Sequence, residues 1–145
     1  MRNNIVSMLV PCSALLVLFL ATALAQGETG TPEIEISIAN ASFVAPSPES
    51  MNLNGEWVKI ANDGGTDESL DGWTLMDQQN HTYTFKGFTL AAGSSVKVHT
   101  GEGNDSMTDL YWGRSSSVWN NDGDVAVLKD AAGNVVAQFP EENER

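Results

Sequence analysis

The stretch LDGWTLMDQQNHTYTFKGFTLAAG, residues 70–93, decides the fold of this chain. Apolar and polar residues alternate through Leu70–Met76 and again through His81–Phe85, and the polar turn Asp77–Asn80 separates the two runs. A period of two puts every second side chain on one face, as in a strand that is buried on one side. The stretch therefore predicts two short strands joined by a turn.

Similar short runs recur along the rest of the chain, with turn-forming residues between them. No segment beyond the N-terminal apolar run repeats apolar residues at helical spacing over several turns. The predicted strands are Glu33–Ile38, Glu56–Ile60, Leu70–Met76, His81–Phe85, Ser95–His99, Asp124–Leu128 and Val135–Phe139. A loop is predicted over Asn40–Asn54, and Leu110–Trp112 is a short apolar piece. Many short strands without helices are typical of an all-β sandwich or barrel.

The N-terminus has the features of an export signal. Arg2 precedes an apolar run that ends at Ala23-Leu24-Ala25, a small-x-small cleavage site. We therefore expect a signal peptide over residues 1–25, a flexible lead over 26–32, one domain over 33–140 and a charged tail over 141–145. The run is also near the length that a membrane span requires, so a retained anchor is the alternative. Cleavage would leave a secreted protein without stable membrane insertion.

Charge and cysteine content exclude several classes of protein. The chain has 19 acidic against 7 basic residues, a net charge of −12, and loss of residues 1–25 removes one basic residue and no acid. Such a surface repels phosphate backbones, so we expect no nucleic-acid partner. The single cysteine, Cys12, falls within the predicted signal. A disulfide, a catalytic cysteine and a zinc–thiolate site are therefore not expected in the mature chain.

No motif identifies a catalytic, cofactor-binding or metal-binding residue, and we predict none of the three. His81 and His99 lack a second ligand at zinc spacing, and no serine lies in a nucleophile elbow. The acidic turns Asn62–Glu68 and Asn120–Asp124 offer clustered oxygens, but neither has the spacing of a calcium loop, and turn chemistry explains them better. Asn40, Asn80 and Asn104 begin glycosylation sequons, which chance explains equally well.

The ordered motifs of the chain resemble the lamin-tail domain family. They are Glu56–Asn62, Leu70–Leu75 with its Gly72-Trp73 pair, Tyr83–Phe85, Leu90–Gly93, Trp119–Asp124 and Leu128–Val136. The resemblance covers Ile34 to Phe139 and implies an immunoglobulin-like antiparallel β-sandwich. That family occurs in nuclear lamins and in many secreted prokaryotic proteins, so the resemblance implies a secreted prokaryotic member that binds or supports rather than catalyses.

We therefore expect an exported, non-enzymatic module that contacts a protein or a surface glycan at or outside the cell surface. A carbohydrate-binding module is the first alternative, because Trp57, Tyr111, Trp112 and Trp119 could stack on sugars. Trp57 is the ring most expected to show an open face, because Val58 and Ile60 take the other side of its strand. A small secreted hydrolase is the second alternative, although no spacing of serine, histidine and aspartate supports it.

Overall fold

The computed structural model describes residues 35–140. The predicted export signal, the flexible lead, the start of the domain at Glu33 and the charged tail lie outside the described residues. Within the described part, no helix is long and apolar enough to cross a membrane.

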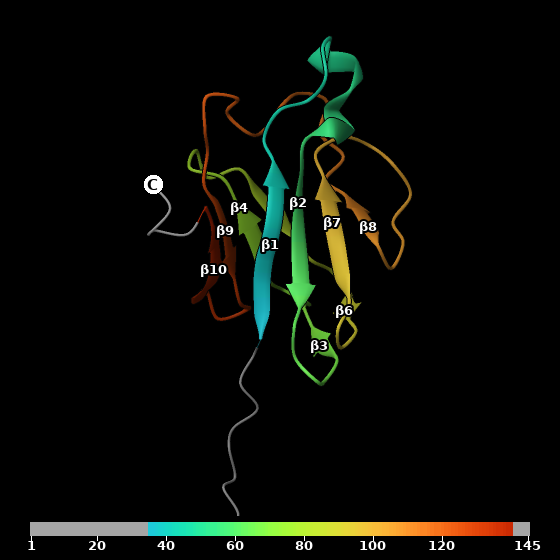
Figure 1. Cartoon of the computed structure of the whole chain (residues 1–145), viewed down its shortest axis with the longest axis vertical. Coiled ribbons are helices and arrows are strands. Elements are labelled where there is room, and N and C mark those ends of the chain that lie inside the picture. Colours follow the sequence, from blue (N-terminus) through green and yellow to red (C-terminus); the bar gives the residue numbers. More distant parts are fainter. Residues whose placement is uncertain (1–34, 141–145) are drawn as a thin grey trace, which may run out of the picture. The chain divides into compact units, whose positions relative to one another are not determined.

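Two four-stranded sheets form the domain, as Figure 1 shows. The first sheet has the order β1 (Ile36–Ser42), β2 (Trp57–Asn62), β7 (Ser95–His99) and β8 (Asp109–Tyr111). The second has the order β10 (Val135–Phe139), β9 (Ala126–Lys129), β4 (Thr74–Met76) and β5 (Thr82–Thr84). A two-stranded piece, β3 (Glu68–Ser69) with β6 (Thr89–Leu90), lies at one end, and the 3-10 turns η1 (Glu49–Met51) and η2 (Leu53–Gly55) lie at the other. The expected all-β sandwich is confirmed.

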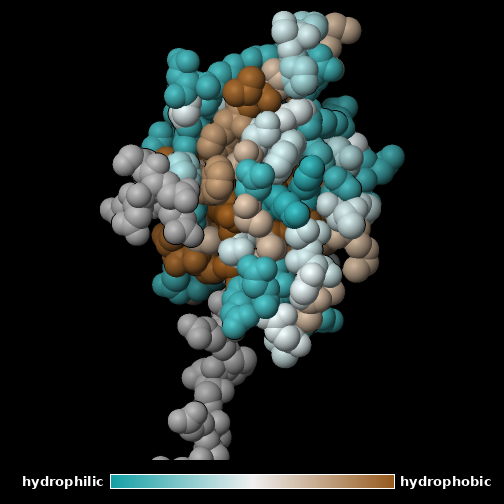
Figure 2. All heavy atoms as spheres, in the orientation of Figure 1, coloured by the Kyte–Doolittle hydropathy of each residue, from teal (hydrophilic) through white to brown (hydrophobic). Residues whose placement is uncertain are grey.

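Side chains at alternate positions of the strands point inward and form the core between the sheets. Val58 and Ile60 of β2 are fully buried, and Val96 and Val98 of β7 are 1% exposed. Because these strands pair antiparallel, their inward side chains form adjacent rows. The second sheet contributes Leu75 to the facing side, also with no exposed surface. Figure 2 shows polar and weakly polar atoms over much of the outward face of the first sheet, which is the complementary half of the alternation.

One pair of strands departs from the antiparallel pattern. β7 and β8 run parallel, with Val98 opposite Leu110 and His99 opposite Tyr111. The other pairs in both sheets are antiparallel. The loop of residues 100–108 makes the parallel pairing possible, because it carries the chain back along the sheet before β8 begins.

The first strand extends further along the chain than its sequence predicts. Within the predicted strand Glu33–Ile38, residues 36–38 are strand, but the prediction of a loop from Asn40 is wrong over residues 40–42, because β1 continues to Ser42. Pairing with β2 shifts register between Ile38 and Asn40 and then continues, with Asn40 opposite Lys59. The polar residues that indicated a loop lie instead on a strand beyond a bulge.

The predicted strand Leu70–Met76 is only half a strand. Residues 74–76 pair in the sheet, whereas Leu70–Trp73 form a turn in which the Trp73 N–H donates to the Leu70 carbonyl at 2.9 Å. Gly72 has a φ of +78°, a backbone conformation that disfavours other residues. Leu70 has no exposed surface and Trp73 is 4% exposed, and two buried residues three apart do not fit the period of a strand.

The two sides of the sandwich differ. β1 and β10 pack against each other along one side. The strand orders then place β8 and β5, the last strand of each sheet, together on the opposite side. The candidate site lies between these two edges.

Candidate functional site

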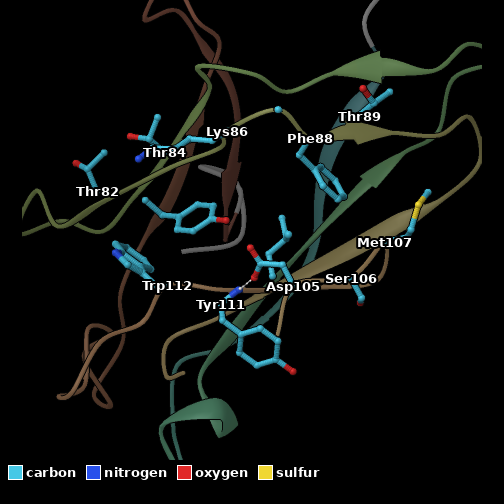
Figure 3. Close-up of a pocket in the computed structure, with 13 residues that line it drawn as sticks. Thr82, Thr84, Lys86, Phe88, Thr89, Asp105, Ser106, Met107, Tyr111 and Trp112 are labelled. Carbon is cyan, nitrogen blue, oxygen red and sulfur yellow. Dashed lines mark hydrogen bonds between the residues drawn. The ribbon is translucent and has the colours of Figure 1, made fainter. Parts of the chain in front are cut away.

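A groove of about 900 Å³ separates β5 from β8. We call it the β5–β8 groove, and Figure 3 shows the side chains around it. One wall comes from β5 and the segment that leads to β6, and the other from β8 and the loop before it. Its lining residues are Thr82, Tyr83, Thr84, Lys86, Gly87, Phe88, Thr89, Asp105, Ser106, Met107, Leu110, Tyr111 and Trp112.

Packed aromatic rings form the inner side of the groove. The rings of Tyr83 and Trp112 meet edge to face, with centroids 5.8 Å apart. Trp112 in turn meets Trp119 at 6.1 Å, Trp119 stacks on Phe43 at 5.0 Å, and Phe43 meets Phe139 at 6.2 Å. We call these five residues the aromatic row. Edge-to-face and offset contacts add to the free energy of burial, so the row holds Trp112 and Tyr83 in place.

Few charged groups line the groove. Among its lining residues, Asp105 and Lys86 are the charged side chains. Burial and then the charge of Asp105 raise the pKa of Tyr83 to about 12. Tyr83 is therefore a neutral phenol over the physiological pH range, able to donate or accept a hydrogen bond. Exposed hydroxyls from Thr82, Thr84 and Thr89 add further polar groups at the rim.

The chain covers its own β8 edge. The Tyr111 N–H donates to Asp105 Oδ1 at 2.9 Å, the bond drawn as a dashed line in Figure 3. The Ser106 N–H donates to the Asp109 carbonyl at 2.8 Å. These bonds satisfy main-chain groups on the outer side of β8, so this edge is closed to a further strand.

The two histidines make structural contacts. His99 Nδ1 lies 3.0 Å from the Asn54 carbonyl oxygen, and its Nε2 lies 2.8 Å from Asp109 Oδ1. His81 Nδ1 lies 2.5 Å from Asp77 Oδ2. Within residues 35–140, no hydrogen bond joins either histidine to a serine. Each imidazole ties its strand to a neighbouring segment, and neither is arranged as a base beside a nucleophile.

Side-chain oxygens in the acidic turns accept hydrogen bonds from main-chain N–H groups. Asp124 is 5% exposed, and its carboxylate accepts N–H groups from Val125 at 2.7 Å, Asn120 at 2.9 Å and Gln78 at 3.2 Å. Asn62 donates to the carbonyls of residues 66 and 90 and accepts the N–H of residue 64. No cluster of three or more potential metal ligands occurs in the described range.

The aromatic residues singled out from the sequence lie in different environments. Trp119 is 3% exposed, whereas Tyr111 and Trp112 are half-buried and line the groove. Trp57 is half-buried too, and Lys97 Nζ lies 4.1 Å from the centroid of its ring. The expectation of an open ring face at Trp57 is therefore not met, because an ammonium group lies over it.

Sequence reasoning missed the other half of the groove. No motif in the sequence indicates a binding role for Tyr83, Phe88, Asp105 or Lys86. The alternation in residues 82–85 indicates which side chains point inward, but not that the strand lies at an edge. Only the strand order brings β5 next to the segment around Trp112.

Comparison with known families agrees with this architecture. The model of the Lamin Tail Domain family matches residues 30–142, most of the chain. The match spans both sheets, the groove and the aromatic row. It agrees with the immunoglobulin-like sandwich that the ordered motifs implied and with a family that is not generally enzymatic. This chain belongs to the lamin tail domain family.

Proposed function

We propose that this protein is an exported, non-enzymatic binding module and that the β5–β8 groove is its contact surface for a protein partner outside the cell. The observation that carries the proposal is the groove itself, where half-buried aromatic rings line a hollow with few charges. Rigid aromatic side chains dominate the energetics of protein interfaces because they lose little conformational entropy on binding. The hydrogen-bonded histidines and acidic turns described above offer no competing site.

Export is the first part of the proposal to test. The Ala23-Leu24-Ala25 site after a single apolar run supports cleavage before Gln26. Intact-mass measurement of the protein recovered from culture medium is expected to give the mass of residues 26–145. Recovery of the uncleaved chain in membranes alone would contradict export and support the retained anchor.

The groove is tested by capturing partners and then measuring affinity for the one recovered. Trp112→Ala is expected to weaken binding about thirtyfold or more, the loss of a typical interface hot spot. Met107→Glu is a second variant, because Met107 lines the groove and is 70% exposed, so a charge there should not disturb the core. Trp57→Ala is the matched control, a half-buried tryptophan that does not line the groove. Equal affinity for all four proteins would place the contact surface elsewhere.

A carbohydrate partner is the second candidate. The observation in its favour is that Tyr111 and Trp112 share the groove with Asp105 and with threonine hydroxyls. Sugars bind by stacking on aromatic rings and by hydrogen bonds to polar groups beside them. A glycan array probed with wild type and Trp112→Ala decides between the two candidates. A glycan signal that Trp112→Ala removes, with no protein captured, would replace the protein partner by a sugar.

A further inference from the structure

Two residues of β5 direct their main-chain N–H and C=O groups away from the neighbouring strand β4. β5 pairs with β4 in a register that sets Leu75 opposite Tyr83. The flanking bonds, from the Phe85 N–H to the Trp73 carbonyl at 2.9 Å and from the Asp77 N–H to the His81 carbonyl at 3.3 Å, identify the hydrogen-bonded pairs of this ladder. Such pairs alternate along an antiparallel ladder. Tyr83 therefore bonds β4, and Thr82 and Thr84 direct their N–H and C=O groups away from it.

No strand pairs with that outer side of β5 in the described part of the chain. β8, the other edge at the groove, differs because Asp105 and Ser106 bond its main chain. Thr82 and Thr84 are both exposed, and both line the groove. The groove thus has one closed edge and one open edge, and the open edge presents N–H and C=O groups at the spacing of a strand.

We infer that the partner binds as an extended polypeptide segment that adds to β5 as a further strand of its sheet. This inference rests on the proposed function, and it specifies how the protein partner is held. Main-chain bonds to Thr82 and Thr84 supply affinity that is independent of the partner's sequence. Directly opposed residues in paired strands point to the same face. A partner residue opposite Tyr83 therefore points inward, against the rings of Tyr83 and Trp112, and is apolar.

Charge decides between a foreign segment and a second copy of this chain. The net charge of −12 makes two copies of the chain repel each other. A foreign segment with basic residues on either side of its apolar position is attracted by the same charge. The occupant is thus an extended segment of a different protein, alternating in pattern and basic overall.

Thr84→Pro tests the added strand by removing one outward N–H group and changes no other side chain of the groove. Proline at residue 84 removes an N–H that points away from β4, so it costs no bond inside the sheet, and edge strands accept proline. Thr84→Val is the matched control, because it removes the hydroxyl and keeps the N–H. The probe is a synthetic peptide chosen from a displayed library of short random peptides for binding to the purified protein. Affinities are measured by calorimetry, and thermal unfolding confirms that both variants fold.

We expect Thr84→Pro to weaken peptide binding about tenfold, because one net hydrogen bond and the strand geometry are lost. Thr84→Val is expected to change the affinity less than threefold. A second arm leaves the protein unaltered. N-methylation of the peptide is expected to abolish binding at alternate residues and to be tolerated between them. Equal tolerance at every position, or a Thr84→Pro variant that binds as wild type does, would overturn the added strand.

The variants separate this inference from the proposed function. Loss of peptide binding in Trp112→Ala together with wild-type binding in Thr84→Pro would keep the groove and reject strand addition. Wild-type binding in both variants would reject the groove. A library that yields no binder, beside a glycan signal that depends on Trp112, would reject both the segment and the protein partner.

Discussion

Glu56 is a carboxyl side chain with no exposed surface, in the interior face of the first sheet. Its Oε2 accepts the Val118 N–H at 3.1 Å, and its Oε1 has no partner among the described residues. Thr100 lies opposite it, since the Thr100 N–H donates to the Glu56 carbonyl at 3.1 Å, and Thr100 Oγ1 is also buried without a described partner. A buried acceptor and a buried hydroxyl therefore lie on facing segments, just before β2 begins and just after β7 ends.

We predict that Glu56→Gln leaves the free energy of unfolding within about 1 kcal/mol of wild type, or raises it. Glutamine keeps an oxygen for the Val118 N–H and adds an NH₂ group that can donate to Thr100 Oγ1. Glu56→Ala leaves that buried N–H without an acceptor and should cost about 1–3 kcal/mol. Urea unfolding of the three proteins measures the difference. A glutamine variant as unstable as the alanine variant would contradict this account.

Asp109 gives the domain a pH-dependent contact. Hydrogen bonds from His99 and then Thr108 hold the pKa of the Asp109 carboxyl below its usual value of 3.8. A carboxyl whose pKa is depressed by folding stabilises the folded state above its unfolded pKa. That contribution falls as the pH drops through the folded pKa. The pH range over which this contribution to stability is lost therefore lies below about pH 4.

We predict that Asp109→Asn is less stable than wild type at neutral pH and loses less stability on acidification from pH 5 to about pH 3. Because the side chain is 39% exposed, solvent screens the contact and the effect is small. Urea midpoints across that pH range give the measurement, with the exposed Asp122→Asn as control. Parallel pH profiles for wild type and Asp109→Asn would show that the contact contributes nothing.

At the scale of elements, the two edge strands at the groove differ in whether other residues hydrogen-bond their outer main-chain groups. Asp105 covers the β8 edge through a side-chain bond to Tyr111, and no residue between 35 and 140 covers β5 in this way. We predict that Asp105→Ala increases hydrogen exchange at the Tyr111 amide about fivefold, because the bond it loses is worth about 1 kcal/mol. Asp105→Asn keeps an acceptor oxygen and should exchange as wild type does.

The Val98 amide, in the neighbouring strand of the same sheet, serves as the internal reference for that measurement. Faster exchange at Val98 as well would indicate general loosening of the sheet. Unchanged exchange at Tyr111 in Asp105→Ala would mean that the carboxylate does not cover the edge.

The sequence predicts some elements well and others not at all, for physical reasons. Ser95–His99 and Val135–Phe139 are strands over the expected residues. The first alternates between buried and half-buried residues, and the second is a largely apolar run bounded by the turn at Gly133-Asn134 and by Pro140. β3 and β6 are two residues each, too short to carry a period. The Leu70–Trp73 segment was predicted as strand because its apolar residues run on into β4, but Leu70 and Trp73 are buried from a turn in which Gly72 has a positive φ.

The site is less predictable than the fold. Trp112 stands out in the sequence as an aromatic residue, but its partner Tyr83 comes from the other sheet. That contact depends on strand order and on the parallel return of β8, and local alternation contains neither. Loop residues such as Asp105 contact β8 and line the groove only because β8 returns to pair parallel with β7.

At the scale of the whole molecule, charge restricts the partners. We predict no significant binding to duplex DNA at about 0.15 M salt, because non-specific binding needs several basic side chains placed against phosphates. Lys59 and Lys97 do lie opposite each other on β2 and β7, but Asp109 is the next residue in that row. Titration of labelled duplex with the purified protein measures this. Micromolar binding that weakens steeply with added salt would show that the local pair outweighs the net charge.

The aromatic row has an optical consequence. Trp119 is 3% exposed and Trp112 is half-buried, and their rings are 6.1 Å apart, close enough for excitation to pass between them. Light absorbed inside the sandwich is therefore emitted in part from the indole at the groove. An occupant that displaces water from Trp112 would shift the emission to shorter wavelengths. The protein thus contains its own fluorescent reporter of occupancy, and binding can be followed without a label.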